Sequence, residues 1–411
     1  MLYLLKRRQR SCFDRTDPSL TNGAMHTNTF SPSNHSSAPK NSGVHKTALE
    51  LLQKASIEVN GSNPWDMQLH DPHVLERAMA QANLGLGEAY MDGDWDAEQL
   101  DEFFARLLAT KLTDQIRPLR LLGHVLAAKL LNLQNVERAK KVGEVHYDLG
   151  NDFYAQMLDT RMTYTCGYWD RAENLEQAQE AKLEMVCRKL QLKPGMRLLD
   201  IGCGWGSLLS YAVEKYGVEG VGVSISKEQI ALAKERYAHL PIDFRLQDYR
   251  ELDEQFDAVA SLGMFEHVGR KNFRTYMEVA HRVLKPGGLF LLHTIGKNAR
   301  HSTPDPWIDK YIFPNGDLPS VGQIGDAADN LFVVEDLHNF GADYDKTLMA
   351  WYQNFDRAWP VFSERLGERF YRMWKYYLLS CAGAFRARDI QLWQWVLSRE
   401  GVKGGYRRPI V

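Results

Sequence analysis

Glycines alternate with other residues in the stretch LLDIGCGWG, Leu198 to Gly206, at the end of an apolar run. The run predicts a buried strand, and Asp200 stands at its carboxyl end. Gly202, Gly204 and Gly206 permit a tight turn whose backbone N–H groups approach a ligand without intervening side chains. The residues that follow have helical spacing. Strand, glycine turn and helix together predict the opening of an α/β unit that binds a nucleotide.

The spacing of these glycines separates two classes of nucleotide site. The dinucleotide fingerprint G-x-G-x-x-G needs a glycine at position 207, where this chain has Ser207. The pattern D-x-G-x-G-x-G instead resembles the first motif of S-adenosylmethionine-dependent methyltransferases. In that family the loop lies against the methionine part and the ribose, and there is no pyrophosphate to bind. A glycine-rich turn in another α/β protein is the alternative that the motif alone leaves open.

Polar side chains follow several predicted strands. They are Asp200, Asp248, the pair Glu266-His267, and His293. Because the carboxyl ends of parallel strands meet at one edge of a sheet, we expect these groups to lie close together. Where many methyltransferases place an acid for the ribose hydroxyls, the second strand carries serines, with a glutamine just after: Ser224, Ser226 and Gln229.

Strands and helices must alternate to bring these positions together. After the first strand, further strands are predicted at Val218–Ser226, Ile242–Leu246, Phe256–Ser261 and Leu289–Thr294. Helices are predicted at Leu175–Leu190, Lys227–Ala238 and Arg270–Leu284. This order predicts a parallel sheet with helices on both faces. The fold class is therefore α/β, a Rossmann-like methyltransferase domain with a smaller, mostly helical amino-terminal domain.

After Thr294 the residue composition of the chain changes. His301 to Ser320 is rich in proline and aromatic residues, which predicts a lid inserted over the carboxyl edge of the sheet. Leu331 to Tyr344 predicts a further strand with an aromatic end. Helices are predicted at Thr347–Trp359, Arg365–Ala384 and Ile390–Leu397.

Composition sets the general class of the protein. The 411 residues suggest two or three domains, and 44% hydrophobic residues are ample for packed cores. A formal net charge of -2 argues against a nucleic-acid partner. The five cysteines lack a C-x-x-C pair, which predicts a reducing compartment and neither a disulfide framework nor a metal site. No run approaches the roughly 20 apolar residues that span a bilayer, and the start lacks the order of a signal peptide. We expect a cytoplasmic protein that meets membranes only at their surface.

The predicted domains are a disordered extension over 1–45, an amino-terminal domain over 46–135, and a catalytic domain over 136–411 with the lid at 296–330. The extension is rich in Ser, Thr, Asn and Pro and cannot bury enough apolar surface to fold. Leu84 to Phe104 either touches an amphipathic ligand or forms a surface helix with an acidic face. Ile116 to Leu133, followed by Lys140-Lys141, is either a basic amphipathic helix at lipid headgroups or a core or dimer helix.

Nine motifs in order resemble the cyclopropane-fatty-acyl-phospholipid synthases: TYTCGYW, LLDIGCGWG, VSIS, LQDYR, SLGMFEHVG, LLHTIG, PDPWIDKYIFPNG, HNFGADYDKTL and CAGAFRARD. The mycolic acid cyclopropane synthases are more distant relatives. The resemblance extends from about Lys46 to about Arg399 and includes the amino-terminal LGLGEAYMDGDW.

The resemblance implies methylene transfer from S-adenosylmethionine to the cis double bond of an unsaturated phospholipid acyl chain, which leaves S-adenosylhomocysteine. The alkene attacks the sulfonium methyl group, and a base removes a methyl proton as the ring closes. The family uses a bound bicarbonate ion as that base. The expected partners are unsaturated phospholipids at the inner face of the membrane and, as one option, a second copy of the chain.

The resemblance also implies the site residues. The ion site maps onto Cys166, Glu266, His293, the backbone at Ile295 and Tyr344, and Cys381 is a secondary site. The donor-binding residues are Tyr164, Thr165, Asp200, Gly202, Gly204, Gly206, Ser224, Ser226, Gln229, Gln247, Asp248 and Ile295. A cationic intermediate favours an aromatic wall, for which the chain offers Tyr168, Trp169, Phe265, Tyr311, Phe313 and Tyr344.

Each of these residues also has a structural interpretation. Cys166 could be a small buried apolar residue, which is the commoner fate of a free cysteine. Glu266 could cap a helix, His293 could be a hydrogen-bonded core histidine, and Tyr344 could serve packing alone. Two other functions compete as well: a relative that adds a methyl branch or a hydroxyl through the same cation, and a lipid-binding protein without catalysis.

Overall fold

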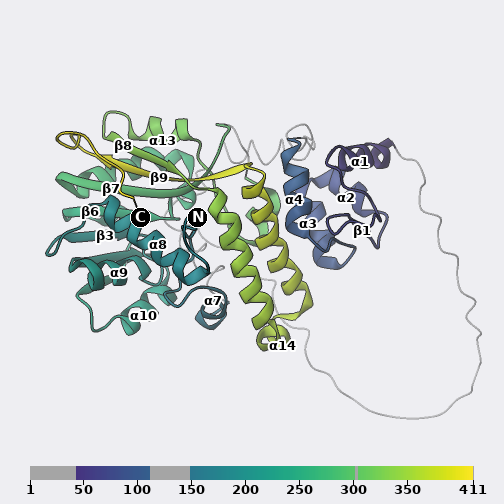
Figure 1. Ribbon diagram of the computed structural model, residues 1–411, viewed down its shortest axis with the longest axis horizontal. Coiled ribbons are helices and arrows are strands. Elements are labelled where there is room, and N and C mark those ends of the chain that lie inside the picture. Colours follow the sequence, from purple (N-terminus) through teal and green to yellow (C-terminus); the bar gives the residue numbers. More distant parts are fainter. Residues whose placement is uncertain (1–42, 112–148, 301–303, 411) are drawn as a thin grey trace, which may run out of the picture. The chain divides into compact units, whose positions relative to one another are not determined.

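Seven strands form one mixed sheet, and most of the candidate residues follow its strands (Figure 1). The computed structural model describes residues 43–111, 149–300 and 304–410. The strands are β3 (Arg197–Ile201), β4 (Glu219–Ser224), β5 (Ile242–Leu246), β6 (Phe256–Leu262), β7 (Leu284–Lys297), β8 (Val333–Asn339) and β9 (Ile390–Ser398). Their order is β5-β4-β3-β6-β7-β9-β8. The direction of the strand order reverses beside β3, and ligands of α/β sheets bind at such a point.

The α/β fold is confirmed, but the sheet is not wholly parallel. The first five strands pair in parallel, whereas β9 pairs antiparallel with both β7 and β8. The helix predicted at Ile390–Leu397 is therefore wrong. Every residue of β9 is buried, because the strand lies inside the sheet and is covered on both faces. A strand buried on both faces shows no alternation of apolar and polar residues, so its pattern does not exclude a helix.

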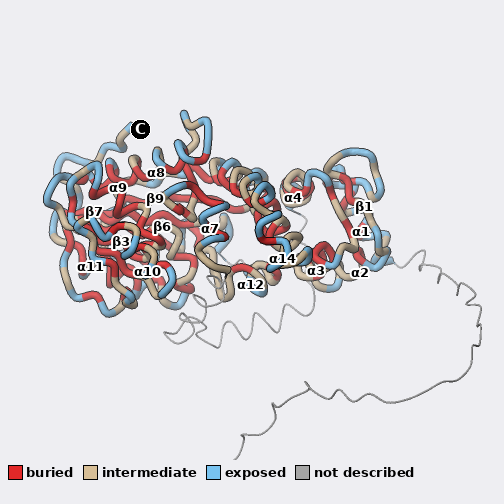
Figure 2. The backbone as a smooth tube through the Cα atoms, turned by 90° about the horizontal axis from the view of Figure 1, so that it is seen from below, coloured by how far each residue is buried: buried red, intermediate tan, exposed pale blue. Residues whose placement is uncertain are grey.

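Helices cover both faces of the sheet, and the strands between them are largely buried (Figure 2). On one face lie α8 (Leu175–Lys189), α9 (Ser207–Tyr216) and α10 (Lys227–Arg236). On the other face lie α11 (Phe273–Val283) and α13 (Val321–Ala328). The apolar residues of α11 recur at helical spacing and all face the core: Phe273, Tyr276, Met277, Ala280 and Val283. Shorter elements are α7 (Asn151–Met157), α12 (Pro306–Tyr311), η2 (Tyr249–Glu251), η3 (Phe265–His267) and η4 (Arg270–Asn272).

One long element, α14 (Ala342–Arg386), is two helices joined at Gly367, which has φ 74° and ψ 162°. Figure 1 shows the two halves side by side. Their rings pair across the contact: Tyr344 stacks on Phe385 with centroids 4.5 Å apart, and Phe355 stacks on Tyr371 at 5.5 Å. The helices predicted at Thr347–Trp359 and Arg365–Ala384 are thus confirmed, except that the second begins only after Gly367.

The amino-terminal elements are α1 (Gly43–Lys54), β1 (Gln68–Leu69), α2 (Val74–Gln81), α3 (Asn83–Asp92), β2 (Trp95–Asp96) and α4 (Leu100–Ala109). Because α1 begins at Gly43, residues 43–45 are helical, contrary to the predicted extension. The rest of that extension, the helix predicted at Ile116–Leu133, Lys140-Lys141 and the boundary at 135 lie outside the described residues. Within the described ranges, no helix is long and apolar enough to cross a membrane.

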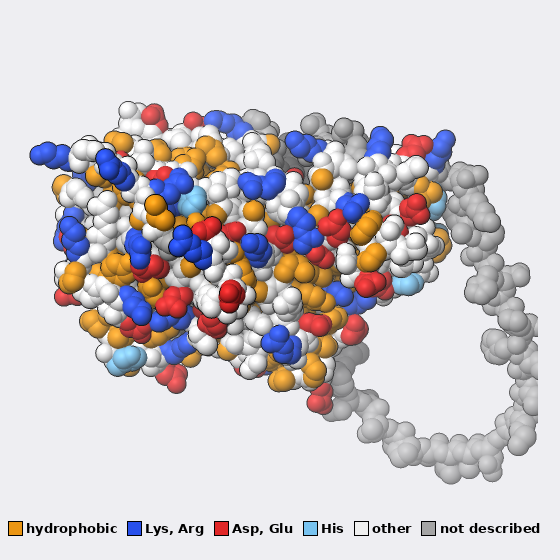
Figure 3. Space-filling model, viewed as in Figure 1, with side chains coloured by type: hydrophobic (Ala, Val, Ile, Leu, Met, Phe, Trp, Pro, Cys, Tyr) orange, Lys and Arg blue, Asp and Glu red, His pale blue; other side chains and the backbone are white. Residues whose placement is uncertain are grey.

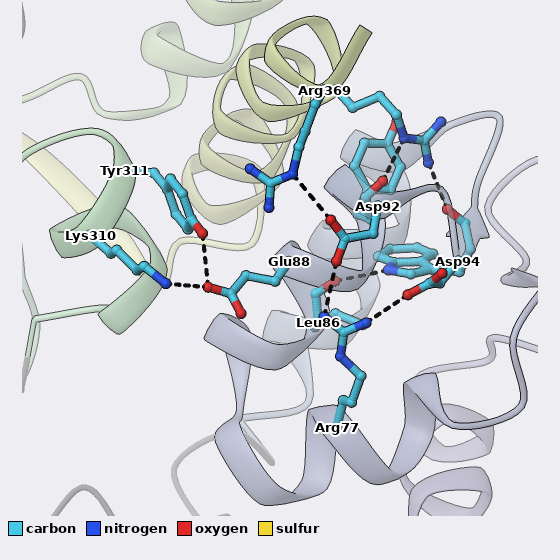
Figure 4. A network of polar contacts seen from close by, with 11 residues as sticks. Arg77, Leu86, Glu88, Asp92, Asp94, Lys310, Tyr311 and Arg369 are labelled. Carbon is cyan, nitrogen blue, oxygen red and sulfur yellow. Dashed lines mark hydrogen bonds and ion pairs between the residues drawn. The ribbon is translucent and has the colours of Figure 1, made fainter. Parts of the chain in front are cut away.

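The acidic face of α3 is engaged in contacts with the later part of the chain (Figure 4). The Glu88 carboxylate accepts hydrogen bonds from Lys310 Nζ at 2.5 Å and Tyr311 Oη at 2.8 Å. Asp92 lies 3.1 Å from Arg369 Nε on α14. The predicted solvated acidic face is therefore paired in part with α12 and α14. Elsewhere, on the face seen in Figure 3, acidic and basic side chains are interspersed, in keeping with the low net charge.

The predicted lid separates into parts with different neighbours. β7 continues to Lys297, so the insertion begins later than expected. Trp307 of α12 is fully buried and packs on Tyr376 of α14, with ring centroids 4.6 Å apart. α13 belongs to the helical layer beside α11, where Ile324 and Ala327 are buried.

Candidate functional site

A cavity of about 1780 Å³ lies where the parallel strands end. The loops after β3, β4, β5, β6 and β7 all contribute to its wall. Helices α2, α3 and α4 extend that wall with apolar side chains: Leu75, Met79, Leu86, Phe103, Phe104 and Leu107. Its lining includes most of the predicted site residues, namely Tyr164, Thr165, Asp200, Gly202, Gly204, Ser224, Ser226, Gln229, Gln247, Asp248, Glu266, His293, Ile295, Tyr344 and Cys381.

The glycines of the loop after β3 have separate roles. Gly204 has φ +54°, and a Cβ built on it would come no nearer than 4.0 Å to another side chain, Gln229 Nε2. The space above Gly204 is therefore open. Gly206 is different, because a Cβ there would lie 2.6 Å from Phe244 Cζ in the core. Gly206 does not line the cavity, and its lack of a side chain leaves room for the Phe244 ring.

Polar groups after β4 and β5 are held by short local bonds. Ser224 Oγ donates to Gln229 Oε1 at 3.2 Å, which turns the Gln229 amide nitrogen toward the glycine loop. The Ser226 hydroxyl accepts the Gln229 backbone N–H at 3.3 Å and caps α10. The Asp248 carboxylate accepts two bonds from the Arg250 guanidinium, at 2.8 and 2.6 Å. These local bonds fix the side chains that form this part of the wall.

Asp200 is a buried acid with an unused oxygen. Its side chain has no partner for Oδ1 among the described residues. Burial raises its pKa to about 7, while the nearby Lys182 ammonium acts in the opposite direction. Lys182 is itself buried and donates to Thr165 Oγ1 at 2.7 Å. A buried acceptor beside an open glycine loop fits a ligand with N–H or cationic groups.

Glu266 follows β6 and presents one free oxygen. Its Oε1 accepts the Ile295 backbone N–H at 2.6 Å, and its Oε2 has no partner in the described part of the chain. Burial raises the pKa of this carboxyl to about 7. The Ile295 N–H, which we expected to face an ion, instead holds Glu266 in place.

His293 and Tyr344 bring further polar atoms to the same cavity. The His293 ring is buried, its Nδ1 lies 3.1 Å from Gln394 Nε2, and its Nε2 has no partner among the described residues. Burial, then the charges of Lys182 and Lys189, hold its pKa well below the usual value. Burial, with Cys166 and Glu266 nearby, raises the pKa of Tyr344 well above its usual value. At neutral pH the site therefore offers a neutral imidazole and a protonated phenol.

Burial favours the protonated form of the two cysteines of the predicted site. The Cys166 thiol does not line the cavity but contacts Gly167 O at 3.1 Å and Thr347 Oγ1 at 3.9 Å. Burial raises its pKa well above the usual value. Cys381 lines the cavity, and burial raises the pKa of its thiol to about 12. Since the thiolate is the reactive form, these raised pKa values disfavour a nucleophilic role for either thiol at neutral pH.

Comparison with known proteins decides the family. The family described as mycolic acid cyclopropane synthetase matches residues 134–395. The cyclopropane-fatty-acyl-phospholipid synthase of Escherichia coli K12 is 55% identical over 368 residues, covering 88% of this chain and 95% of the relative. The chain belongs to the cyclopropane synthase family. Its members are S-adenosylmethionine-dependent methyltransferases, so this chain is an enzyme of that class.

Solved structures of cyclopropane synthases have the same fold. The cyclopropane synthase MmaA2 of Mycobacterium tuberculosis matches with a TM-score of 0.61 and 30% identity, over 65% of this chain and 99% of that one. The mycolic acid cyclopropane synthase CmaA1, solved with SAH and CTAB, matches with a TM-score of 0.60 and 33% identity, over 63% of this chain and 97% of that one.

The aromatic wall expected of a cyclopropane synthase is present but composed differently. Of the six predicted rings, only Phe313 and Tyr344 line the cavity. The others pack elsewhere; for example, Phe265 stacks on Phe273 in the core. The cavity instead gains rings from α4, α14 and the loops: Phe103, Phe104, Tyr164, Trp205, Tyr249, Tyr377 and Phe385.

Sequence reasoning also missed buried polar residues near the site. Lys182 lies on α8 beside the apolar Leu183 and Val186, so a charged residue on a buried helix face was the available signal. Gln394 lies in the apolar stretch of β9 and contacts His293. A polar residue inside such a stretch marks a buried hydrogen-bond network.

Proposed function

We propose that the protein is a cyclopropane-fatty-acyl-phospholipid synthase, which transfers a methylene group from S-adenosylmethionine to the cis double bond of an unsaturated phospholipid acyl chain. One observation carries this proposal. A single cavity joins the glycine loop and the free polar atoms of Glu266 and His293 to the apolar side chains of α2, α3 and α4. A polar donor and a long apolar chain could thus meet inside it.

The residues around the glycine loop fit the donor. Gly204 leaves open space for close backbone approach, and the unused Asp200 oxygen suits the donor's N–H groups. Gln229 and Ser224 extend this polar wall. When bound, the donor supplies a sulfonium methyl carbon that bonds to the alkene.

Glu266, His293 and Tyr344 suit a small planar anion, and we propose bicarbonate as the general base. The Tyr344 hydroxyl can donate to an anionic oxygen, and the free Glu266 oxygen can accept the ion's own O–H. With its proton so held, the ion turns a basic oxygen to the donor methyl group. Aromatic faces such as Tyr164 and Tyr377 favour the transient positive charge on the alkyl chain in a low dielectric.

Membrane contact is part of the proposal, because the substrate is a phospholipid. We propose that the protein works in the cytoplasm and associates peripherally with the inner face of the membrane. The sequence of Ile116 to Lys141 suits an anionic surface, since basic residues interrupt its leucines. In a homodimer, two such segments that reached the same membrane would bind it with combined affinity.

Expression in a host that lacks cyclopropane lipids tests this function. Mass spectrometry of the host phospholipids should reveal unsaturated chains that have gained CH₂ and lost their double bond. Chains that carry a methyl branch or a hydroxyl would favour the related methyltransferase; a probable fatty acid methyltransferase of Pseudomonas putida is 36% identical to this chain. Unchanged lipids, together with no binding of the donor, would favour a lipid-binding protein.

A further inference from the structure

We propose that Lys189 and Gln394 are positioning residues that fix His293 as the neutral tautomer with its proton on Nε2. His293 would then serve the cavity as a hydrogen-bond donor and not as the base. The tautomer assignment stands on geometry alone, whereas its role toward an anion rests on the proposed function.

Lys189, Gln394 and His293 form a buried chain of hydrogen-bonded side chains. Lys189 Nζ on α8 donates to Gln394 Oε1 at 2.8 Å, and Gln394 Nε2 lies 3.1 Å from His293 Nδ1. Gln394 and His293 are directly opposed across the antiparallel pair of β9 and β7. All three are at most 1% exposed. Buried cross-strand partners in this register have little freedom to rearrange.

The donor and acceptor in each hydrogen bond follow from the Lys189 ammonium group. The other groups at Lys189 Nζ are Asp336 Oδ2 at 3.8 Å and His338 Nδ1 at 3.1 Å. Because an ammonium has donors only, the Gln394 oxygen must face Lys189 and its NH₂ must face His293. His293 Nδ1 is then an acceptor without a proton, and the proton of the neutral ring lies on Nε2.

The surrounding charges favour the same state. Burial lowers the pKa of Lys189 to about 7, and Asp336 acts in the opposite direction. When Nζ loses its proton, the amine keeps two N–H donors, so the contact with Gln394 Oε1 at 2.8 Å can persist in the uncharged form. Protonation of His293 Nδ1 would set two donors against each other, beside the positive charges of Lys182 and Lys189. Asp200, Glu266 and Tyr344 are titratable groups on other elements that line the same cavity as His293.

The consequence is a matched pair of groups on the cavity wall. His293 Nε2–H is a donor, and Glu266 Oε2 is an acceptor. Bicarbonate carries one O–H and two oxygens that accept hydrogen bonds, so this pair can hold it in one orientation. If the His293 proton were on Nδ1, both His293 Nε2 and Glu266 Oε2 would be acceptors. The pair could then no longer distinguish one orientation of the ion from another.

Nitrogen NMR of the full chain labelled with ¹⁵N-histidine tests the tautomer, with His293→Gln used to assign the signals. In the wild type, His293 Nδ1 should be pyridine-like and Nε2 pyrrole-like between about pH 6 and 9. In Gln394→Glu the new carboxylate keeps the bond to Lys189 and accepts from Nδ1, so the proton should move to Nδ1. Gln391→Glu is the matched control, since it adds the same charge to β9 while its side chain faces Arg388. It should leave the His293 signals unchanged.

A wild-type His293 with a protonated Nδ1, or one that titrates within this range, would overturn the inference whatever the activity. Turnover separates it from the proposed function. We expect Gln394→Glu to lower kcat about 10- to 100-fold, the range for outer partners of ligating histidines, with little change in the KM of the donor. If the tautomer shifts as expected while kcat and bicarbonate stimulation match the wild type, the positioning inference holds and the bicarbonate role is wrong.

Discussion

Replacement of one glycine tests where the methyl donor lies. Gly204→Ala introduces a Cβ into the open space above the loop, where the nearest side-chain atom is Gln229 Nε2 at 4.0 Å. The change costs stability because φ is +54°, and a left-handed conformation costs a residue with a Cβ about 1–2 kcal/mol. Gly195→Ala is the matched control. Gly195 has φ +80° and nothing within 4 Å of an added Cβ, and it lies outside the cavity wall.

The two variants should therefore lose similar stability but differ in binding. Titration calorimetry with S-adenosylhomocysteine should give at least about a tenfold loss of affinity for Gly204→Ala, or about 1.4 kcal/mol. Gly195→Ala should bind like the wild type, and thermal unfolding should report a comparable loss of stability for both. Unchanged affinity in Gly204→Ala would refute the placement of the donor over this loop. An equal loss of affinity in both variants would attribute the effect to general destabilisation.

The remaining predictions concern the base, the thiol and the membrane. Glu266→Gln keeps the shape and removes the charge, so turnover should fall about 10²–10⁴-fold with little loss of donor affinity; normal turnover would place the base elsewhere. Because the Glu266 pKa is raised to about 7 and the ionised form is needed, wild-type turnover at fixed bicarbonate should fall as the pH drops through about 7; the same acid limb in Glu266→Gln would assign it to another group. Cys381→Ala should retain kcat within about threefold, since a thiol with a pKa of about 12 supplies no nucleophile; inactivation without loss of folding would contradict this. Replacement of Lys129, Lys140 and Lys141 by Glu should weaken sedimentation with anionic vesicles, at roughly 1 kcal/mol per basic residue; unaltered sedimentation would exclude this segment.

The βα order from Leu198 to Thr294 was predictable because each buried strand ends at a polar or glycine turn before a helical pattern begins. That order alone implies that Asp200, Glu266 and His293 share one edge of the sheet, and all three do line the cavity. The strand β9 was not predictable in this way. Its position between β7 and β8 depends on pairings with residues about 55 to 110 positions away, which no local pattern encodes.

The sequence also could not show which way the side chains of the predicted site residues point. Cys166 follows Thr165, which lines the cavity, yet the Cys166 thiol faces Thr347 on α14. Gly206 belongs to the same motif as Gly204, but Phe244 of β5 gives it a packing role. The apolar wall from α2, α3 and α4 was equally hidden, since it depends on contacts between parts of the chain far apart in sequence.

Isotope retention in the product tests the central claim most directly. The purified protein would receive S-adenosylmethionine with a trideuterated methyl group, together with vesicles of an unsaturated phospholipid, and mass spectrometry would count deuterium in the modified acyl chain. If the cavity carries out methylene transfer with removal of one methyl proton, the chain should contain a cyclopropane with two deuterium atoms. A product that keeps all three, or a chain that gains no deuterium, would contradict the account.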